Sequence, residues 1–483
     1  MSNILNIWKG RTLTLFGKNL LINSLSNSLF LFNAQIETPP TDFIKSAEKL
    51  HKEFLWGGTP KISHHTIISD YSKGGIRYKD LNDFISAIEI RNILRLPLHS
   101  EGSHTVLPIF WIKTLFKIPI GAKNVGDSHY EKFFQKSLSI LDCLYQLPRK
   151  NHYTGHPYYY DALKDLEKMW TKVGRNIENI LSIPMWYNRF LKTKFDSEIS
   201  MAGFNFLKDV FPENKQIEAL HGLTGYKSRK LKNIIDKVPP DWKSQIATSL
   251  NCCVTVYPAK ILRLNGEDRR LKEMQGNQLY NALIGNKTRF PRGLLKWRED
   301  FELSDANIRY AFTSLHRYLS SASDQAFQYK ILTNILPTNE YLCRYKVLNS
   351  SLCSRCGSES DTILHSIWSC RLVLPYVSQV LNYLRSHCQV KDTEVTAKPY
   401  IFGGQNMGLN HIFLQLKKEL FYNKELDLTP DAFCELFMSK MRKTMIKEKV
   451  IFIQNSKFDL YNRKWSMFKH IYDYMGPDIN DIF

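Results

Sequence analysis

Four residues in the C-terminal third of the chain have the types and spacing of a metal site. Cys353, Cys356, His365 and Cys370 form the pattern Cys-x2-Cys-x8-His-x4-Cys. Zinc prefers thiolate sulfur and imidazole nitrogen, and three cysteines with one histidine complete a tetrahedral structural site. The short first spacing lets two thiolates come from one turn, where Gly357 eases the bend. Because no position stays open for a catalytic water, we predict structural Zn²⁺ at these four residues.

The other interpretation of this pattern is three buried thiols and a core histidine. Nine cysteines in 483 residues are too few for a disulfide scaffold, and the number is odd. We therefore expect a reducing, intracellular compartment, where clustered cysteines bind metals or fill a core. Three of the nine fall within eighteen residues beside a histidine at ligand spacing, which favours the metal. Residues 361–365 are predicted to begin a short helix that presents His365, with Cys370 close to the same face.

Basic residues are concentrated in the middle of the chain. The formal net charge is +20, and residues 221–300 alone hold 16 Lys and Arg against 7 Asp and Glu. Such an excess indicates a polyanionic partner, because cationic side chains neutralise phosphates and release counterions. Phe290 and Trp297, interleaved with the cations, could stack on bases or belong to the core. The candidate nucleic-acid-binding residues are Lys227, Arg229, Lys230, Arg269, Arg270, Arg289, Arg292, Lys296 and Arg298.

Helical periodicity dominates the first hundred residues. Apolar residues recur every three or four positions from Leu13 to Ile36, and Pro39 with Pro40 should end that helix near Thr38. Thr41 or Asp42 can cap a second helix, which Gly57 and Gly58 would end. A turn at residues 73–76 precedes a third helical stretch, 81–94. A similar apolar stripe, which includes Met438, Met441 and Met445, predicts a buried helix face in the tail.

We therefore predict a mainly α, multi-domain helical chain with a small zinc-knuckle module. No apolar run approaches the roughly 20 residues that span a bilayer, and the N-terminus lacks the features of a signal peptide. We expect no membrane association.

Short motifs along most of the chain resemble those of one family. They are Leu13-Thr14-Leu15-Phe16-Gly17-Lys18, Thr38-Pro39-Pro40, Phe54-Leu55-Trp56-Gly57-Gly58, Lys73-Gly74-Gly75-Ile76, Leu336-Pro337-Thr338, His365-Ser366-Ile367-Trp368-Ser369-Cys370 and the ending Lys464-Trp465. In this order they resemble the C-terminal part of non-LTR (LINE-type) retrotransposon reverse transcriptases. The longer gap before the histidine also resembles that family rather than the retroviral zinc knuckle.

The resemblance implies a division and a function. Residues 1–100 would be a thumb-like helical region, 101–325 a basic helical linking region, 326–390 a zinc-knuckle domain and 391–483 a helical tail. In the family this part holds template RNA and target DNA during target-primed reverse transcription. A nuclear location or a cytoplasmic ribonucleoprotein follows from the resemblance, which leaves the oligomeric state open.

Catalytic carboxylates of the polymerase kind are missing from the sequence. A reverse transcriptase palm holds two metal ions with adjacent aspartates and a third carboxylate, and this sequence contains no Asp-Asp pair. The chain is expected to begin where the family's palm ends, with the endonuclease further upstream, so we expect no catalysis. Two alternatives remain: a polymerase whose palm is not recognisable, and a zinc-stabilised protein-interaction module with no nucleic-acid role.

Overall fold

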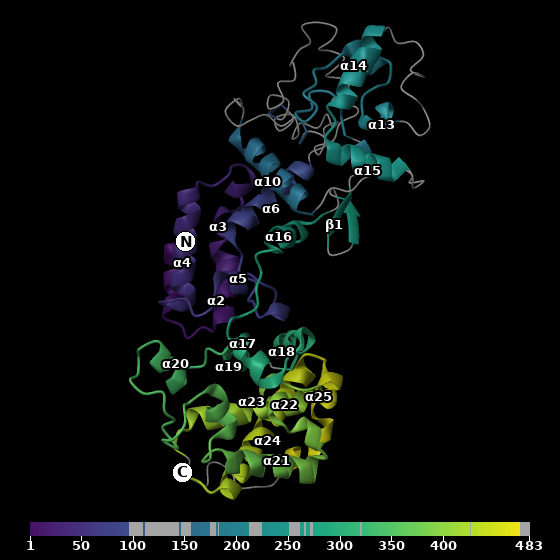
Figure 1. Cartoon of the computed structure of the whole chain (residues 1–483). Helices are drawn as coiled ribbons and strands as arrows, with labels where there is room; N and C mark the ends of the chain where they lie inside the picture. The colour runs from purple at the N-terminus through teal and green to yellow at the C-terminus, as the bar shows by residue number, and fades with distance from the viewer. Residues whose placement is uncertain are drawn as a thin grey trace. The chain divides into compact units, whose positions relative to one another are not determined.

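The structure, a computed structural model, is mainly helical, as predicted (Figure 1). It describes residues 1–95, 110–111, 144–145, 156–173, 180–181, 183–211, 225–250, 261–264, 267–270, 274–318, 321–425 and 427–473. Within these ranges the only sheet is an antiparallel pair of short strands, β1 (Ile261–Leu264) and β2 (Glu267–Arg270). No helix in the described part combines the length and the apolar character needed to cross a bilayer.

The chain divides into two compact units, each built from separate stretches of sequence. The first contains residues 1–26, 49–78 and 287–483, and the second contains 27–48 and 79–286. Helix α4 (Thr41–Trp56) contributes residues to both units. The predicted four-part division is not tested by this grouping and stays a prediction.

The first unit carries the cysteine–histidine cluster. Its elements are α1 (Ser2–Lys9), α2 (Leu15–Leu21), η1 (Ile22–Ser26), α5 (His64–Ile67), η3 (Tyr71–Lys73), α17 (Leu294–Phe301), α18 (Asp305–Tyr318), α19 (Ala322–Leu332), α20 (Asn339–Arg344), η7 (His365–Ser369), α21 (Leu374–Cys388), η8 (Asp392–Glu394), α22 (Ala397–Phe402), α23 (Met407–Tyr422), α24 (Pro430–Gln454), α25 (Phe458–Trp465), η9 (Ser466–Phe468) and α26 (Lys469–Tyr472). Figure 1 shows α21, α22, α23 and α24 gathered in one bundle.

The second unit contains the basic helix α14. Its elements are α3 (Ser28–Leu31), η2 (Asn33–Gln35), α6 (Leu81–Leu94), α10 (Pro157–Val173), α12 (Ser197–Met201), α13 (Leu207–Val210), α14 (Gly225–Asp236), α15 (Pro240–Leu250), β1, β2 and α16 (Gly276–Ile284). Helix α6 packs against both α10 and α16.

The helices predicted for the first hundred residues are confirmed in type and approximate place. Helix α4 begins at Thr41, and Gly57 follows it with a left-handed φ of 62°. Asp80 caps α6, since its carboxylate accepts a hydrogen bond from the Asp83 amide. The first predicted helix differs, because the π-helical turn η1 interrupts it and it continues only as short helical segments.

The turn at residues 73–76 connects distant parts of the first unit. Gly74 has a left-handed φ of 76°, and a side chain on Gly75 would meet the carbonyl oxygen of Ser69 at 1.9 Å. Glycine therefore permits both the turn and the close approach of the backbone. The Tyr329 hydroxyl of α19 donates to the Gly74 carbonyl at 2.9 Å, and the Arg289 amide donates to the His65 carbonyl at 3.1 Å.

The methionine stripe of the tail lies in the core, as predicted. Met438, Met441 and Met445 on α24 are fully buried, and α24 packs against α21, α25 and α26. Val450 and Ile453, further along the same periodic pattern, are more than half exposed. The apolar period therefore extends beyond the part of α24 that the neighbouring helices cover.

A buried ion pair fixes the end of α25 against α24. The Lys464 ammonium lies 2.8 Å from Glu448 Oε2, and the Trp465 indole donates to the same oxygen at 2.8 Å. Lys464 also contacts His411 Nδ1 at 2.8 Å. Each buried charge thus has a close partner, which burial of ions requires.

Candidate metal centre

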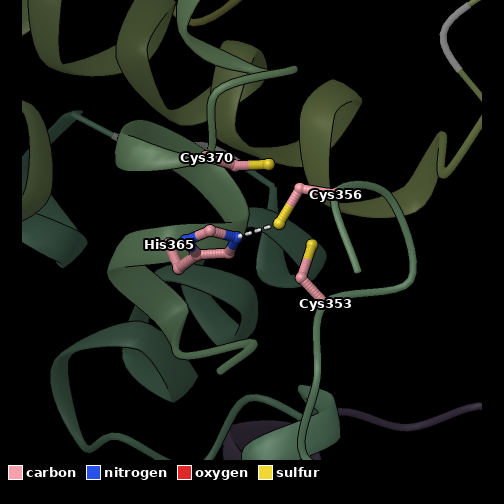
Figure 2. Close-up of side chains that lie close together, drawn as sticks. All are labelled: Cys353, Cys356, His365 and Cys370. Atoms are coloured by element: carbon pink, nitrogen blue, oxygen red, sulfur yellow. Dashed lines mark hydrogen bonds between the residues drawn. The ribbon is translucent and has the colours of Figure 1, made fainter. Parts of the chain in front are cut away.

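The four predicted ligands converge at one buried point of the first unit. The Sγ atoms of Cys353, Cys356 and Cys370 and a ring nitrogen of His365 all lie within 4.8 Å of one another. Figure 2 shows the three sulfur atoms and the imidazole facing a common centre, with His365 Nε2 3.3 Å from Cys356 Sγ. Zinc bond lengths imply ligand separations of roughly 3.5–3.8 Å in a tetrahedron. The longest separations therefore need to shorten by about 1 Å for the four atoms to coordinate one ion.

One tight turn presents the first two thiols. The Gly357 amide donates to the Cys353 carbonyl at 2.9 Å, and Gly357 takes a left-handed φ of 67° that favours glycine. The Cys353 amide donates to the Glu359 carbonyl at 2.8 Å, and a single antiparallel bridge joins Leu352 to Ser360. The local sequence thus closes the loop without needing distant contacts, and Gly357 has the predicted role.

A short helical segment presents the other two ligands, as predicted. The Thr362 hydroxyl accepts from the His365 amide at 3.0 Å, and His365 begins the π-helical turn η7. The Cys370 amide then donates to the His365 carbonyl at 3.1 Å, which places the cysteine at the end of the same turn. The Cys370 carbonyl accepts from the Leu374 amide at the start of α21. Both ligands are therefore held between ordered elements.

Arg355, inside the Cys-x2-Cys loop, ties the cluster to the end of α23. Its guanidinium donates to the carbonyls of Leu420, Asn423 and Lys424, and to that of Ser366 in η7. The last carbonyls of a helix lack intrahelical partners, so this arginine satisfies groups that would otherwise need water. Arg355 was not predicted from the sequence, in which its position inside the loop was the only local signal.

Asp361 anchors the other side of the loop. One of its carboxylate oxygens accepts from the amide of Asn339, at the start of α20, at 3.0 Å, and the other accepts from the Ser366 hydroxyl. The Asp361 side chain is fully buried, so these donors offset the cost of burying it. His365 Nδ1 lies 3.2 Å from Glu359 Oε2, although the pair lacks aligned hydrogen-bond geometry.

The thiols differ electrostatically. The Ser358 hydroxyl donates to Cys356 Sγ and, with nearby backbone amides, lowers the pKa of that thiol to about 5. Burial, together with the neighbouring thiols, raises the pKa of Cys370 to about 11. The Cys370 thiolate is therefore disfavoured unless a cation compensates its charge, which a bound metal ion does.

The candidate cations on α14 lie in the second unit. Lys227 Nζ is 2.9 Å from Glu198, and Lys230 pairs with Asp196. Arg229 is exposed and makes no ion pair within the described ranges. Partly exposed pairs contribute about 0–1 kcal/mol, so a phosphate can compete for these lysines. Arg269 and Arg270 have their backbone in β2, and their side chains lie outside the described part of the structure.

The remaining four candidates lie in the first unit, around α17. Lys296 Nζ is 3.4 Å from Glu340, and Arg298 pairs with Asp305. Arg289 and Arg292 are exposed and have no acidic partner among the residues that the structure describes. The structure therefore divides the nine candidates between two units, and it separates the seven whose side chains it describes into paired and unpaired cations, which the sequence did not distinguish.

The two aromatic residues between these cations differ in environment. The Trp297 ring is buried, donates to the Ile331 carbonyl at 3.1 Å and packs edge-on against Phe402. Trp297 is therefore a core residue, one of the two interpretations left open by the sequence. Phe290 is half-buried and lies under the Arg298 guanidinium.

Comparisons with known proteins do not add to this description. Neither a scan against models of protein families nor a search of curated proteins found a match for the chain.

Proposed function

We propose that the Cys353, Cys356, His365 and Cys370 cluster holds a structural zinc ion. The observation that carries this is the convergence of all four ligand atoms within 4.8 Å in a buried site. Zinc fits this donor set because borderline-soft ions favour thiolate and imidazole. Bound zinc would join the loop, η7 and the start of α21. An intracellular, reducing location would keep the thiols available.

We further propose that the chain binds RNA and DNA as the non-catalytic C-terminal part of a LINE-type reverse transcriptase. The net charge of +20 and the unpaired, exposed Arg229, Arg289 and Arg292 support a polyanionic partner. The short sequence motifs, which follow one another in the order found in that family, support this resemblance. In that role the chain would hold template RNA and target DNA while another part of the protein performs synthesis.

Binding to labelled RNA and DNA, measured by electrophoretic mobility at two salt concentrations, tests this function. We expect binding that weakens steeply between about 50 and about 200 mM salt, because released counterions drive association. A peptide nucleic acid of the same sequence, which lacks phosphates, is the control and should not bind. Equal binding to both backbones, or no binding at low salt, would refute the proposal.

A matched pair of variants sharpens the assay. Arg289→Ala removes an unpaired cation and should reduce the salt slope for single-stranded RNA by about 0.7 if it contacts one phosphate. Lys296→Ala removes a cation that Glu340 already compensates, so we expect a smaller change.

A protein-interaction module is the second candidate. Val347, Leu348 and Leu352 are exposed between α20 and the zinc loop, and exposed apolar groups are typical of protein contacts. This alternative predicts no binding to RNA in the same assay, even at the lower salt concentration.

A further inference from the structure

Two adjoining hollows run along the first unit between its N-terminal segments and residues 291–422. One encloses about 340 Å³ and the other about 570 Å³. Trp56, Lys61 and Ile335 line both, so the two hollows adjoin at these residues. We call the two hollows together the cationic groove. All its lining residues belong to the first unit.

The groove is positively charged. Lys330 lines the smaller hollow, Arg292 the larger one, and Lys61 both, while neither hollow has an aspartate or glutamate among its described lining residues. These three side chains are exposed and make no ion pair in the described part of the chain. Partial burial lowers the pKa of the Lys330 ammonium, and the charge of Lys61 lowers it further. Like charges held close together without a counterion favour the binding of an anion.

Aromatic rings lie beside these cations. Tyr345 lines the larger hollow and is 52% exposed, and Tyr422 lines the smaller one and is 61% exposed. The Tyr345 ring packs on Tyr341, with centroids 4.8 Å apart, so its orientation is supported from one side. Trp56, shared by the two hollows, is half-buried.

Cations and exposed aromatic rings in one groove favour a ligand that carries both phosphates and unpaired bases. Ammonium and guanidinium groups track phosphates, and aromatic faces stack on unpaired bases. A duplex covers its base faces by internal stacking, so it can use the cations but not the rings. The combination therefore favours a single strand over a duplex or a simple anion.

We infer that the cationic groove binds single-stranded nucleic acid, with phosphates at Lys61, Lys330 and Arg292 and bases stacked on Tyr345 and Tyr422. The inference rests on the proposed nucleic-acid function and assigns a strand type and a place to it. It involves none of the metal ligands.

Fluorescence anisotropy with the full chain tests the phosphate contacts. The probes are oligo-uridine and oligo-thymidine of about 12 nucleotides and a duplex of similar length, titrated between about 50 and about 200 mM salt. Lys61→Ala/Lys330→Ala removes two groove cations, and Lys447→Ala/Lys457→Ala removes two exposed lysines of the same unit outside the groove. We expect the first pair to reduce the single-strand salt slope by about 1.4, and the second to leave it nearly unchanged.

A single substitution tests the stacking. Tyr345→Ala should weaken single-strand binding by about 5-fold or more and leave duplex binding unchanged. Inorganic polyphosphate should compete less well than either oligonucleotide at equal phosphate. The RNA and DNA arms show whether the groove prefers one sugar.

The outcomes separate the inference from the proposed function. If the wild-type chain binds with steep salt dependence and both double variants behave alike, the groove is not the site, while nucleic-acid binding stands. Duplex binding as sensitive to Tyr345→Ala as single-strand binding, or equal competition by polyphosphate, would refute base stacking. If the wild-type chain binds no nucleic acid, both proposals fail.

Discussion

Two cysteines of the candidate metal site have thiols in different environments. Ser358 favours the thiolate of Cys356, whereas burial opposes that of Cys370. Removing one of the three cysteines would leave two thiols and the imidazole, one ligand short of a tetrahedral site. The affinity of a structural zinc site depends on the full set, so a single substitution should have a large effect.

Cys356→Ser should reduce the zinc content from about one ion per chain to well below that, because a neutral hydroxyl is a poor zinc ligand. Inductively coupled plasma mass spectrometry of the purified chain measures the content. Cys343→Ser is the matched control, because Cys343 is a half-buried free cysteine outside the cluster. Unchanged zinc in Cys356→Ser, or equal loss in both variants, would contradict the ligand assignment.

At the scale of elements, the loop between Cys353 and Cys356 caps the C-terminal end of α23. Arg355 places one guanidinium against three carbonyls at the end of that helix and against one in η7. A positive charge at a helix C-terminus also interacts favourably with the helix dipole. The loop and α23 should therefore stabilise one another.

Arg355→Lys keeps the charge but removes the planar group that reaches several carbonyls at once. We expect the free energy of unfolding to fall by about 1–3 kcal/mol, because the part-buried carbonyls of Ser366 and Leu420 lose the guanidinium donor, while zinc content stays close to that of the wild type. Urea denaturation followed by circular dichroism measures the first quantity. Arg463→Lys, an exposed arginine on α25, should change it by less than about 0.5 kcal/mol. A similar small change for Arg355→Lys would exclude the capping role.

At the scale of the whole molecule, two buried groups give the units opposite responses to pH. In the second unit, burial raises the pKa of Glu89 to about 7, although the Thr38 hydroxyl donates to it. In the first unit, burial lowers the pKa of Lys417 to about 7. Its ammonium donates to Gln328 Oε1 at 2.6 Å and to the Tyr400 carbonyl at 2.9 Å.

The sign of each effect follows from proton linkage. Folded Glu89 holds its proton to a higher pH than the unfolded group, whose pKa is near 4.5, so its contribution to stability is lost as pH rises from 4.5 to about 7. Folded Lys417 releases its proton at a lower pH than the unfolded value of 10.5, so stability is gained as pH rises from about 7 to 10.5.

Variants isolate these contributions. The difference in unfolding free energy between the wild type and Glu89→Gln should fall as pH rises from 4.5 to about 7. The difference between the wild type and Lys417→Met should rise as pH rises from about 7 to 10.5. The slopes should not exceed about 1.4 kcal/mol per pH unit, the limit for one proton. Denaturation curves across pH measure both. Asp236→Asn and Lys447→Met change exposed charges, and their differences should stay nearly flat. If the differences for Glu89→Gln and Lys417→Met do not change with pH, the proton linkage is refuted.

The convergence of the four Cys and His residues and much of the helical framework were predictable from sequence, because their determinants are local. The spacing from Cys353 to Cys370 lies in one turn and one short helix, and Gly357 marks the bend. Proline, glycine and capping residues set the bounds of α4 and α6. The exposure of Val450 and Ile453 differed from the pattern, because periodicity does not show where a neighbouring helix ends.

Tertiary structure decided which charges are compensated and which surfaces combine. Arg355 donates to carbonyls about 65 residues further along the chain, and Lys61 and Lys330 line one hollow although they lie far apart in the sequence. Such pairs cannot be predicted from their spacing in the sequence, because only the packing of distant helices and loops brings them together. The local turns of this protein and the residue types of its candidate site were thus determined by the sequence alone. The cationic groove, the cap on α23 and the division of the basic residues between two units arise only from the packed chain.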